Sequence, residues 1–376
     1  MGRALGDTDQ HVFIVDQVRA NEQSMRWSVG FQRELPHQWV FEASYVGNRG
    51  YDLNVATVDG TNARNYVELN AVPERFLSTS PVRDNVINGQ LTTNVPNPFA
   101  GLLPGTTING ANIQKQQLLK PYPQFLNVRS ERRDGTSSYN AAQVRLEKRF
   151  TTNYSLLLAY TYSKFNEKLY LLNPTDTNLT SFLSDTDVPH KITVSGIWQL
   201  PFGKEHKLDL GSAGNAILGG WSLQGIYTWQ AGRPVTFPNV YFDGDPSKLK
   251  ADYSDPDHIF DTSGFYFHDA AVQTNGADDP AKQRGDTRIA LVNNVRTFSF
   301  RPGLRGQSIS LLDFSVVRTV TLRNDVRLQF RFEAINALNQ AVLGNPNTTP
   351  SNANFGKSTG QNNIPRNLQF GLKFLF

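Results

Sequence analysis

Charged residues recur at every second position in several stretches of the sequence, and this spacing limits the chemistry that they can do. Arg145 and Glu147 stand in QVRLEKRF, and Arg331 and Glu333 stand in QFRFEAIN. Side chains two positions apart point to the same side of an extended strand. Such residues could line a water-filled lumen, or they could form ordinary ion pairs between neighbouring strands. The lumen-facing candidates are Glu42, Arg145, Glu147, Arg327, Arg331 and Glu333.

The sequence predicts no catalytic machinery. Its six histidines are scattered, and none forms a metal-binding pair at helical spacing. Cysteine is absent, which excludes disulfides, thiolate metal sites and thiol catalysis. We find no nucleophile elbow, phosphate-binding glycine loop or dinucleotide fingerprint. We therefore predict a protein that is not an enzyme, with no catalytic residue, no cofactor and no metal centre.

One acidic stretch, YFDGDPSKLKADYSDPDHIFD, leaves a second interpretation open. It contains Asp243, Asp245, Asp252, Asp255, Asp257 and Asp261 in what is expected to be a surface loop. Oxygen-rich loops can bind Ca²⁺, but this spacing lacks the central glycine and the terminal glutamate of an EF-hand. A solvated acidic loop is favoured over a Ca²⁺ site.

Composition and charge exclude several other classes of protein. The net charge of +4 comes from 37 basic and 33 acidic residues spread along the chain, so no basic run predicts a nucleic-acid partner. No stretch approaches the ~18 consecutive apolar residues of a membrane-spanning helix. The mean hydropathy of -0.42 does not exclude a membrane barrel, because half of each barrel strand faces water. The opening MGRALGDTDQHVFIVDQ shows no export signal.

Strict alternation of apolar and polar residues predicts about nine strands of about ten residues each. The predicted strands lie in residues 24–35, 38–48, 139–150, 154–164, 190–200 and 220–230, in two halves of 311–336, and in 367–376. This length suits a tilted strand that crosses a bilayer. Short links follow Leu35, Phe150 and Val320, and long links separate them, with 201–218 as a longer turn on the short side. The longest link, Arg49 to Ser138, is rich in turn residues and is expected to be an irregular surface loop.

The two faces of these strands differ in a way that favours a membrane over a soluble β-sandwich. A sandwich packs an aliphatic inner face and exposes a charged outer one. Here the apolar face is rich in aromatic residues near the strand ends, as in the girdles of membrane barrels, and the opposite face carries charges that would suit a wet lumen. Lys148 and Arg318 depart from the apolar pattern. Both lie close to a short turn, from which their charges can reach the interface.

The last strand has an apolar ladder and an aromatic C-terminus. Its outward-facing residues are Leu368, Phe370, Leu372, Phe374 and Phe376. We interpret them as an outer-membrane insertion signal that is read by the barrel assembly machinery. The fold class expected is therefore all-β: an antiparallel transmembrane β-barrel in contact with outer-membrane lipid, here a partial barrel of about nine strands.

The chain resembles the C-terminal barrel portion of TonB-dependent outer-membrane receptors of the large Oar-like group. The matching stretches include WSVGFQREL, ASYVGNRG, VPNPFAG, LLKPYPQF, SSYNAAQVRLEKRF, VPHKITVSGIWQLPFG, GWSLQGIYTWQAGRPVTF, LQFRFEAINALN and PRNLQFGLKFLF. They span nearly the whole chain in the expected order.

This resemblance implies a barrel of about 22 strands with an N-terminal plug that contacts TonB. The sequence departs from that pattern, since it shows no signal peptide, no plug and too few strands. We therefore expect a fragment, in which residues 1–23 are the remnant of a preceding extracellular loop and residues 24–376 are the C-terminal part of the barrel.

Three functions follow as hypotheses. The first is a part of a TonB-dependent receptor that takes up a large or scarce ligand, whose identity the sequence does not reveal. The second is an outer-membrane anchor for surface loops in adhesion, assembly or secretion. The third is an outer-membrane hydrolase, for which no nucleophile and base are visible. A plug encoded upstream would favour the first, and its absence would favour the second.

Overall fold

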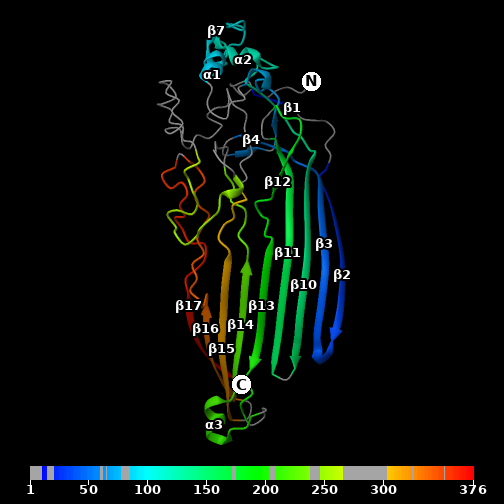
Figure 1. The fold of residues 1–376 in the computed structure, drawn as a ribbon, viewed down its shortest axis with the longest axis vertical. Coiled ribbons are helices and arrows are strands. Elements are labelled where there is room, and N and C mark those ends of the chain that lie inside the picture. The colour runs from blue at the N-terminus through cyan, green and yellow to red at the C-terminus, as the bar shows by residue number, and fades with distance from the viewer. Residues whose placement is uncertain are drawn as a thin grey trace.

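The protein, seen here in a computed structural model, is elongated along a sheet of long strands (Figure 1). The structure describes residues 11–14, 21–59, 62–64, 66–77, 85–151, 153–171, 175–203, 208–237, 246–265, 303–323, 326–350 and 352–376. Small helices and strands gather at one end of the sheet, and one helix and the C-terminus lie at the other. No helix in these ranges is long and apolar enough to cross a membrane.

Nine long strands form the continuous path of a twelve-stranded main sheet within the described part of the chain. They are β2 (Gln23–Leu35), β3 (Trp39–Leu53), β10 (Gly135–Thr151), β11 (Tyr154–Leu171), β13 (His190–Gln199), β14 (Trp221–Gln230), β15 (Ile309–Arg323), β16 (Val326–Ile335) and β17 (Asn367–Leu375). Each pairs antiparallel with its neighbours in that order. The sheet is open, because β2 and β17 each lie at an edge. The predicted strands and their antiparallel order are confirmed.

At the end of the sheet where the C-terminus of the chain lies (Figure 1), the links between strands are mostly short, as predicted. We call this end the short-turn end. The 3₁₀ turn η1 (Pro36–Gln38) joins β2 to β3, with left-handed φ values of 61° at His37 and 62° at Gln38. Asn153, at φ 81°, precedes β11. The link before β14 is longer and contains helix α3 (Gly211–Leu218). Short turns at this end and long segments at the other are the arrangement of a membrane barrel with periplasmic turns and extracellular loops.

The register brings the apolar residues of neighbouring strands onto one side of the sheet, which we call the apolar face. One row across six strands consists of Phe41, Leu146, Leu158, Val194, Tyr227 and Leu312, each directly opposite the next. The other side, which we call the polar face, has the mixed row Val40, Glu147, Leu157, Ser195, Ile226 and Asp313. The alternation within each strand therefore adds up to two continuous faces, one predominantly apolar and one mixed.

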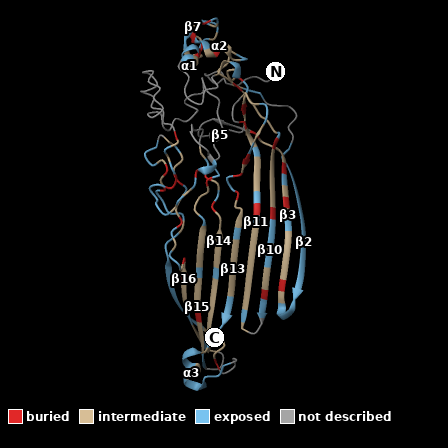
Figure 2. Cartoon of the chain, in the orientation of Figure 1, coloured by how far each residue is buried: buried red, intermediate tan, exposed pale blue. Residues whose placement is uncertain are grey.

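Little of the main sheet is buried on either face. Figure 2 shows its strands mostly intermediate or exposed, with buried positions scattered along them. Every residue of β2 is exposed, and Phe370 of β17 is 82% exposed. A soluble sandwich would bury one face of each sheet against the other. This sheet is instead a single layer whose apolar side chains remain open.

The long link from Arg49 to Ser138 is not the irregular loop that the sequence predicted. Strand β3 continues to Leu53 and β10 begins at Gly135. Between them lie β4 (Ala56–Asp59), β5 (Asn62–Arg64), β6 (Val67–Glu68), η2 (Glu74–Phe76), α1 (Asn85–Thr92), β7 (Asn94–Pro96), β8 (Asn112–Gln114), α2 (Lys115–Leu119) and β9 (Asn127–Ser130). Strand β1 (His11–Ile14) pairs in parallel with β9.

Buried amide side chains explain why this link is folded. Asn70 is 1% exposed, and its Nδ2 donates to the carbonyl oxygens of Tyr122 at 2.9 Å and Phe125 at 2.7 Å. Nδ2 of Asn97 donates to the carbonyl oxygens of Ile108 at 2.7 Å and Gly110 at 2.6 Å. Each amide satisfies backbone groups that have no strand partner. Residues that read as turn formers therefore also join distant parts of the segment.

Candidate functional site

The polar face carries one charged group on β3 and β10. Nη2 of Arg145 lies 2.6 Å from Oε2 of Glu147, and its Nη1 lies 3.8 Å from Oε2 of Glu42. The side chains of these three residues are 50%, 33% and 41% exposed, so the group is open to solvent. Exposed ion pairs of this kind add little to stability. The shorter contact runs along one strand, whereas the ordinary-pairing interpretation expected contacts across strands.

A second charged group lies on β16, on the same face. Nη1 of Arg331 is 3.4 Å from Oε1 of Glu333. Arg327 lies closer to the short-turn end of the sheet, directly opposite Thr321. Strands β11, β13, β14 and β15 separate this group from the group on β3 and β10. The six lumen-facing candidates thus share one face, but the structure places them in two separate groups. Their lumen role stays a prediction.

The apolar ladder of β17 lies on the apolar face, opposite β16. Leu368, Phe370, Leu372 and Phe374 pair with Ala334, Phe332, Phe330 and Leu328, respectively. The rings of Phe332 and Phe370 have centroids 5.2 Å apart. Phe376 follows the last strand residue and is 95% exposed. The geometry fits an edge that another strand or lipid could cover, and the insertion signal itself stays a prediction.

Lys148 and Arg318, the basic residues that were predicted to interrupt the apolar face, are each held at a backbone carbonyl. Nζ of Lys148 donates to the carbonyl oxygen of His37 and lies 5.7 Å from the centre of the Tyr154 ring. Nη2 of Arg318 donates to the carbonyl oxygen of Ala216 in α3. Both residues contact the short-turn end, where they were expected to reach the interface.

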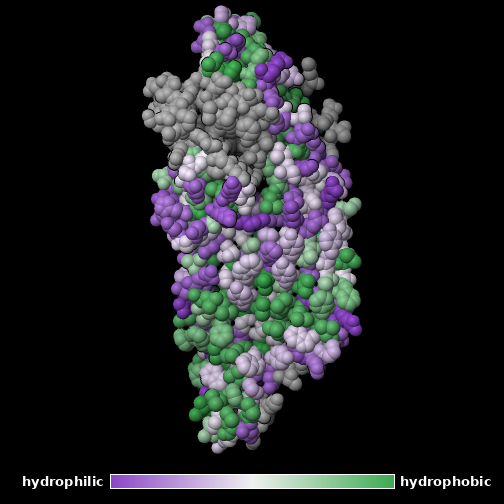
Figure 3. Space-filling model, viewed as in Figure 1, coloured by the Kyte–Doolittle hydropathy of each residue, from purple (hydrophilic) through white to green (hydrophobic). Residues whose placement is uncertain are grey.

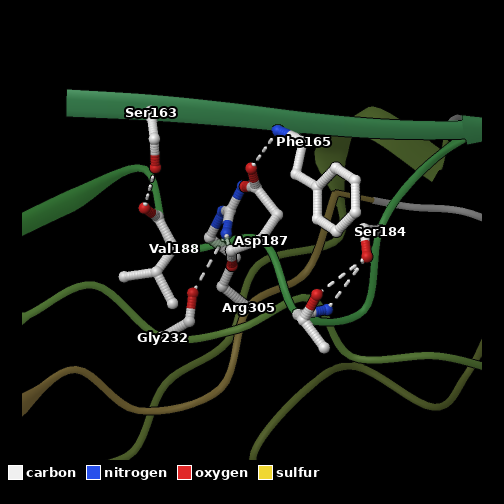
Figure 4. A network of polar contacts seen from close by, with 8 residues as sticks. Ser163, Phe165, Ser184, Asp187, Val188, Gly232 and Arg305 are labelled. Atoms are coloured by element: carbon white, nitrogen blue, oxygen red, sulfur yellow. Dashed lines mark hydrogen bonds and ion pairs between the residues drawn. The ribbon is translucent and has the colours of Figure 1, made fainter. Parts of the chain in front are cut away.

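Sequence reasoning missed an ion pair between a buried carboxylate and a partly exposed arginine at the outer end of the sheet, opposite the short turns. Oδ2 of Asp187 lies 2.7 Å from Nη2 of Arg305, and the Asp187 side chain is 1% exposed. The backbone N–H of Phe165 donates to Oδ1 of Asp187 at 2.7 Å, and Nη1 of Arg305 donates to the Gly232 carbonyl at 3.0 Å. Figure 4 shows Arg305 and Asp187 pointing toward one another beneath β11. We call these four residues the rim network.

The rim network joins segments that are far apart in the sequence. Asp187 and Arg305 are 118 residues apart, and Phe165 belongs to β11. Both oxygens of the buried carboxylate accept hydrogen bonds, which offsets the desolvation of its charge. The network therefore fixes where the chain enters β13 and β15 relative to β11.

The described aspartates of the acidic stretch are exposed, whereas some of its apolar residues are buried in a small outer core. The core consists of Val235, Leu249, Ile259, Phe260, Phe265 and Leu304, and the Phe265 and Phe355 rings have centroids 5.0 Å apart. Asp252, Asp255 and Asp261 are exposed, and each accepts a hydrogen bond from a backbone N–H two residues later. The hydrogen bond from His258 lowers the pKa of Asp255.

The Ca²⁺ interpretation finds no support in the described part of this stretch. No group of three or more carboxylate or histidine side chains lies close enough to hold a metal ion among the described residues. The carboxylates of Asp252, Asp255 and Asp261 instead close local turns. Asp243 and Asp245 lie outside the described residues.

Tyr253 makes the stability of this outer core depend on pH in the alkaline range. Its Oη donates to the Arg305 carbonyl at 3.2 Å, and burial raises its pKa to about 12. Because the folded-state pKa exceeds the ordinary value of about 10, its stabilising contribution is complete below pH ~10 and is lost as the pH rises toward 12. In an ultraviolet titration, the absorbance of the parent minus that of Tyr253→Phe should show one phenolate forming near pH 12. A difference that titrates near pH 10 would contradict the buried environment.

Long tilted strands, a continuous open apolar face and alternating short and long links define the wall of an outer-membrane β-barrel. The chain matches the family described as outer membrane beta-barrel domain over residues 3–369. It belongs to this family, and the expected fold class and outer-membrane location are confirmed.

Solved structures give a second comparison. The chain is similar to the outer membrane transporter YddB from Escherichia coli, with 10% identity, a TM-score of 0.42, and coverage of 98% of this chain and 33% of that one. It is also similar to P. aeruginosa FpvA bound to a heterologous pyoverdine, with 9% identity, a TM-score of 0.40, and coverage of 94% and 27%. The chain therefore spans 33% and 27% of the lengths of these two proteins. The comparison with curated protein sequences gives no match.

Proposed function

We propose that this chain is part of a TonB-dependent outer-membrane receptor that imports a ligand too large or too scarce for porins. The observation that carries this proposal is the number of long strands in the sheet, which has not yet closed. Barrels of eight strands fill their interior with side chains or one small ligand, whereas the main sheet of the described residues, with nine long strands, is still open. A complete barrel around this sheet would be wider, and its interior would be lined by the exposed ion pairs of the polar face. Such a lumen suits passage of a ligand and a plug that gates it.

The proposal includes partners beyond the chain. Residues 24–376 would be the C-terminal part of the barrel and residues 1–23 part of a preceding extracellular loop. Further strands would pair with the edges β2 and β17, and a plug domain would contact TonB. The barrel assembly machinery would recognise the apolar ladder of β17. The open edges and the exposed apolar side chains of β17 support this arrangement.

A second candidate function is an anchor for surface loops in adhesion, assembly or secretion. It is favoured by the folded outer segments, which have their own buried residues, including the cluster of Val55, Val67 and Leu171. Segments of this kind could present a surface to another macromolecule without any transport.

Uptake measurements separate the two functions. Cells that carry or lack the gene for this protein would be given labelled iron chelates, cobalamin and oligosaccharides, with and without collapse of the inner-membrane proton gradient. Import predicts that one labelled compound accumulates only in cells with the gene, and only while the gradient is intact. Equal accumulation in both strains, together with loss of surface attachment in the deletion strain, would contradict import and favour the anchor.

A further inference from the structure

Charge on the apolar face has one sign only. Among the described residues of the main sheet, its paired positions include no aspartate or glutamate, whereas the polar face carries Glu42, Glu147, Asp313 and Glu333. The charged residues of the apolar face lie toward the two ends of the strands: Arg33, Lys148 and Arg318 at the short-turn end, and Arg49, Lys164 and Lys168 at the other. A bilayer presents its phosphates at the same two levels, where basic side chains are most favourable.

Arg318 is the residue of this set with the most defined surroundings. Its guanidinium lies 5.3 Å from the centre of the Trp221 ring, and its Nη2 donates to the Ala216 carbonyl. Its Nε is buried and has no hydrogen-bond partner within the described parts of the chain, and no carboxylate there forms an ion pair with the guanidinium of Arg318. A cation on the apolar face without a protein anion calls for an anion from its surroundings.

Helix α3 lies beyond the short-turn end of the sheet (Figure 1), where two side chains of the apolar face hold it. Nε1 of Trp221 donates to the Ile217 carbonyl at 2.9 Å, so two side chains of the apolar face hold the last turn of the helix. Gly220, at φ 73°, makes the turn into β14, where a Cβ atom would overlap the Thr319 carbonyl. The helix is therefore anchored at the short-turn, periplasmic end of the wall by residues of the apolar face.

The exposed surface of α3 and its flanks is apolar. Leu208, Leu210, Ile217 and Leu218 are 46%, 44%, 67% and 45% exposed. The visible surface at this end of the molecule is mostly hydrophobic (Figure 3). Asp209, the one charged residue of 208–220, accepts a hydrogen bond from Nδ2 of Asn215 at 2.6 Å, at the opposite end of the helix from Arg318. A short apolar helix next to a tryptophan and a cation is typical of a segment that lies in a membrane interface.

We propose that α3, Trp221 and Arg318 form a binding site for a phospholipid of the periplasmic leaflet. Arg318 binds the headgroup phosphate by charge-assisted hydrogen bonds, Trp221 lies at the headgroup level, and the exposed leucines and Ile217 contact the acyl chains. The occupant is a lipid and not free phosphate, because the apolar side chains beside the guanidinium need acyl chains to cover them. This inference rests on the outer-membrane location and is independent of transport.

Lipid retention provides the first test. The full chain would be folded into vesicles of phosphatidylethanolamine and phosphatidylglycerol, released in mild detergent, and analysed by native mass spectrometry. Arg318→Gln should lower the occupancy of one bound phospholipid by about tenfold, the size expected for the loss of one charge-assisted contact. The control Lys373→Gln removes a cation at the same level of the sheet but on the polar face, opposite Gln329, and should leave occupancy unchanged. Equal retention by the parent and Arg318→Gln, or displacement of the lipid by excess inorganic phosphate, would overturn the proposal.

Fluorescence quenching gives a second test that leaves Arg318 intact. The difference in emission between the parent and Trp221→Phe reports on Trp221 alone. Lipids brominated near the headgroup should quench this difference more strongly than lipids brominated near the chain ends or than aqueous iodide. Stronger quenching by iodide would place Trp221 in water and overturn the proposal, whether or not the Arg318 variant folds.

Discussion

Replacing Leu158 by arginine is expected to block insertion of the sheet into a membrane. Leu158 lies on the apolar face of β11, directly opposite Leu146 and Val194. An arginine on the lipid face at the middle of a bilayer costs about 2–4 kcal/mol. The measurement is the fraction of protein that floats with phosphatidylcholine vesicles in a density gradient, and this fraction should fall sharply for Leu158→Arg.

The neighbouring leucine supplies a matched control. Leu157 belongs to the same strand but lies on the polar face, directly opposite Glu147 and Ser195. Leu157→Arg should insert as the parent does, because the new cation faces water and a carboxylate. If the two variants insert equally well, or if Leu157→Arg is the defective one, the assignment of the two faces is wrong.

Removing Arg305 should destabilise the outer end of the sheet strongly. Arg305→Ala leaves the Asp187 carboxylate buried without its cation. Breaking a fully buried ion pair typically costs about 3–5 kcal/mol, and the 28% exposure of the Arg305 side chain places the expected loss at the lower end of that range. The expected result is a lower urea midpoint of unfolding in detergent micelles, followed by tryptophan fluorescence.

An exposed ion pair in the outer segments serves as the control for Arg305→Ala. Nζ of Lys357 lies 3.6 Å from Oδ1 of Asp257, whose side chain is 72% exposed. Lys357→Ala should change the free energy of unfolding by no more than about 1 kcal/mol. A loss of stability in Arg305→Ala no greater than in Lys357→Ala would show that the rim network does not hold the strands together.

The strands and their faces could be predicted because the signal is local. In β11, Leu156, Leu158 and Tyr160 alternate with Leu157 and Ala159, and the period of two alone places the first three on one side. Short turns such as η1 then set the register within a hairpin, here that of β2 with β3. The basic exceptions Lys148 and Arg318 could also be recognised, because each stands near a chain reversal.

Contacts between distant loops could not be predicted in this way. Nothing in the sequence around Asp187 indicates a partner 118 residues away. Phe260 and Phe355 stand in stretches without periodicity, so their shared core was not visible from the pattern. Asn70 and Asn97 were read as turn formers, because the same amide can close a local turn or satisfy remote carbonyl groups. The outer segments were therefore the part of the fold that sequence reasoning described least well.

The antiparallel order of the main sheet restricts how a cylinder can be completed around it. With nine alternating strands in the described part of the chain, β2 and β17 head in the same direction. A second copy joined edge to edge in the same membrane orientation would set these two strands parallel, unlike the antiparallel neighbours of bacterial barrels. In the proposed complete barrel, the added strands would therefore begin and end with strands that run opposite to β2 and β17, and their number would be odd.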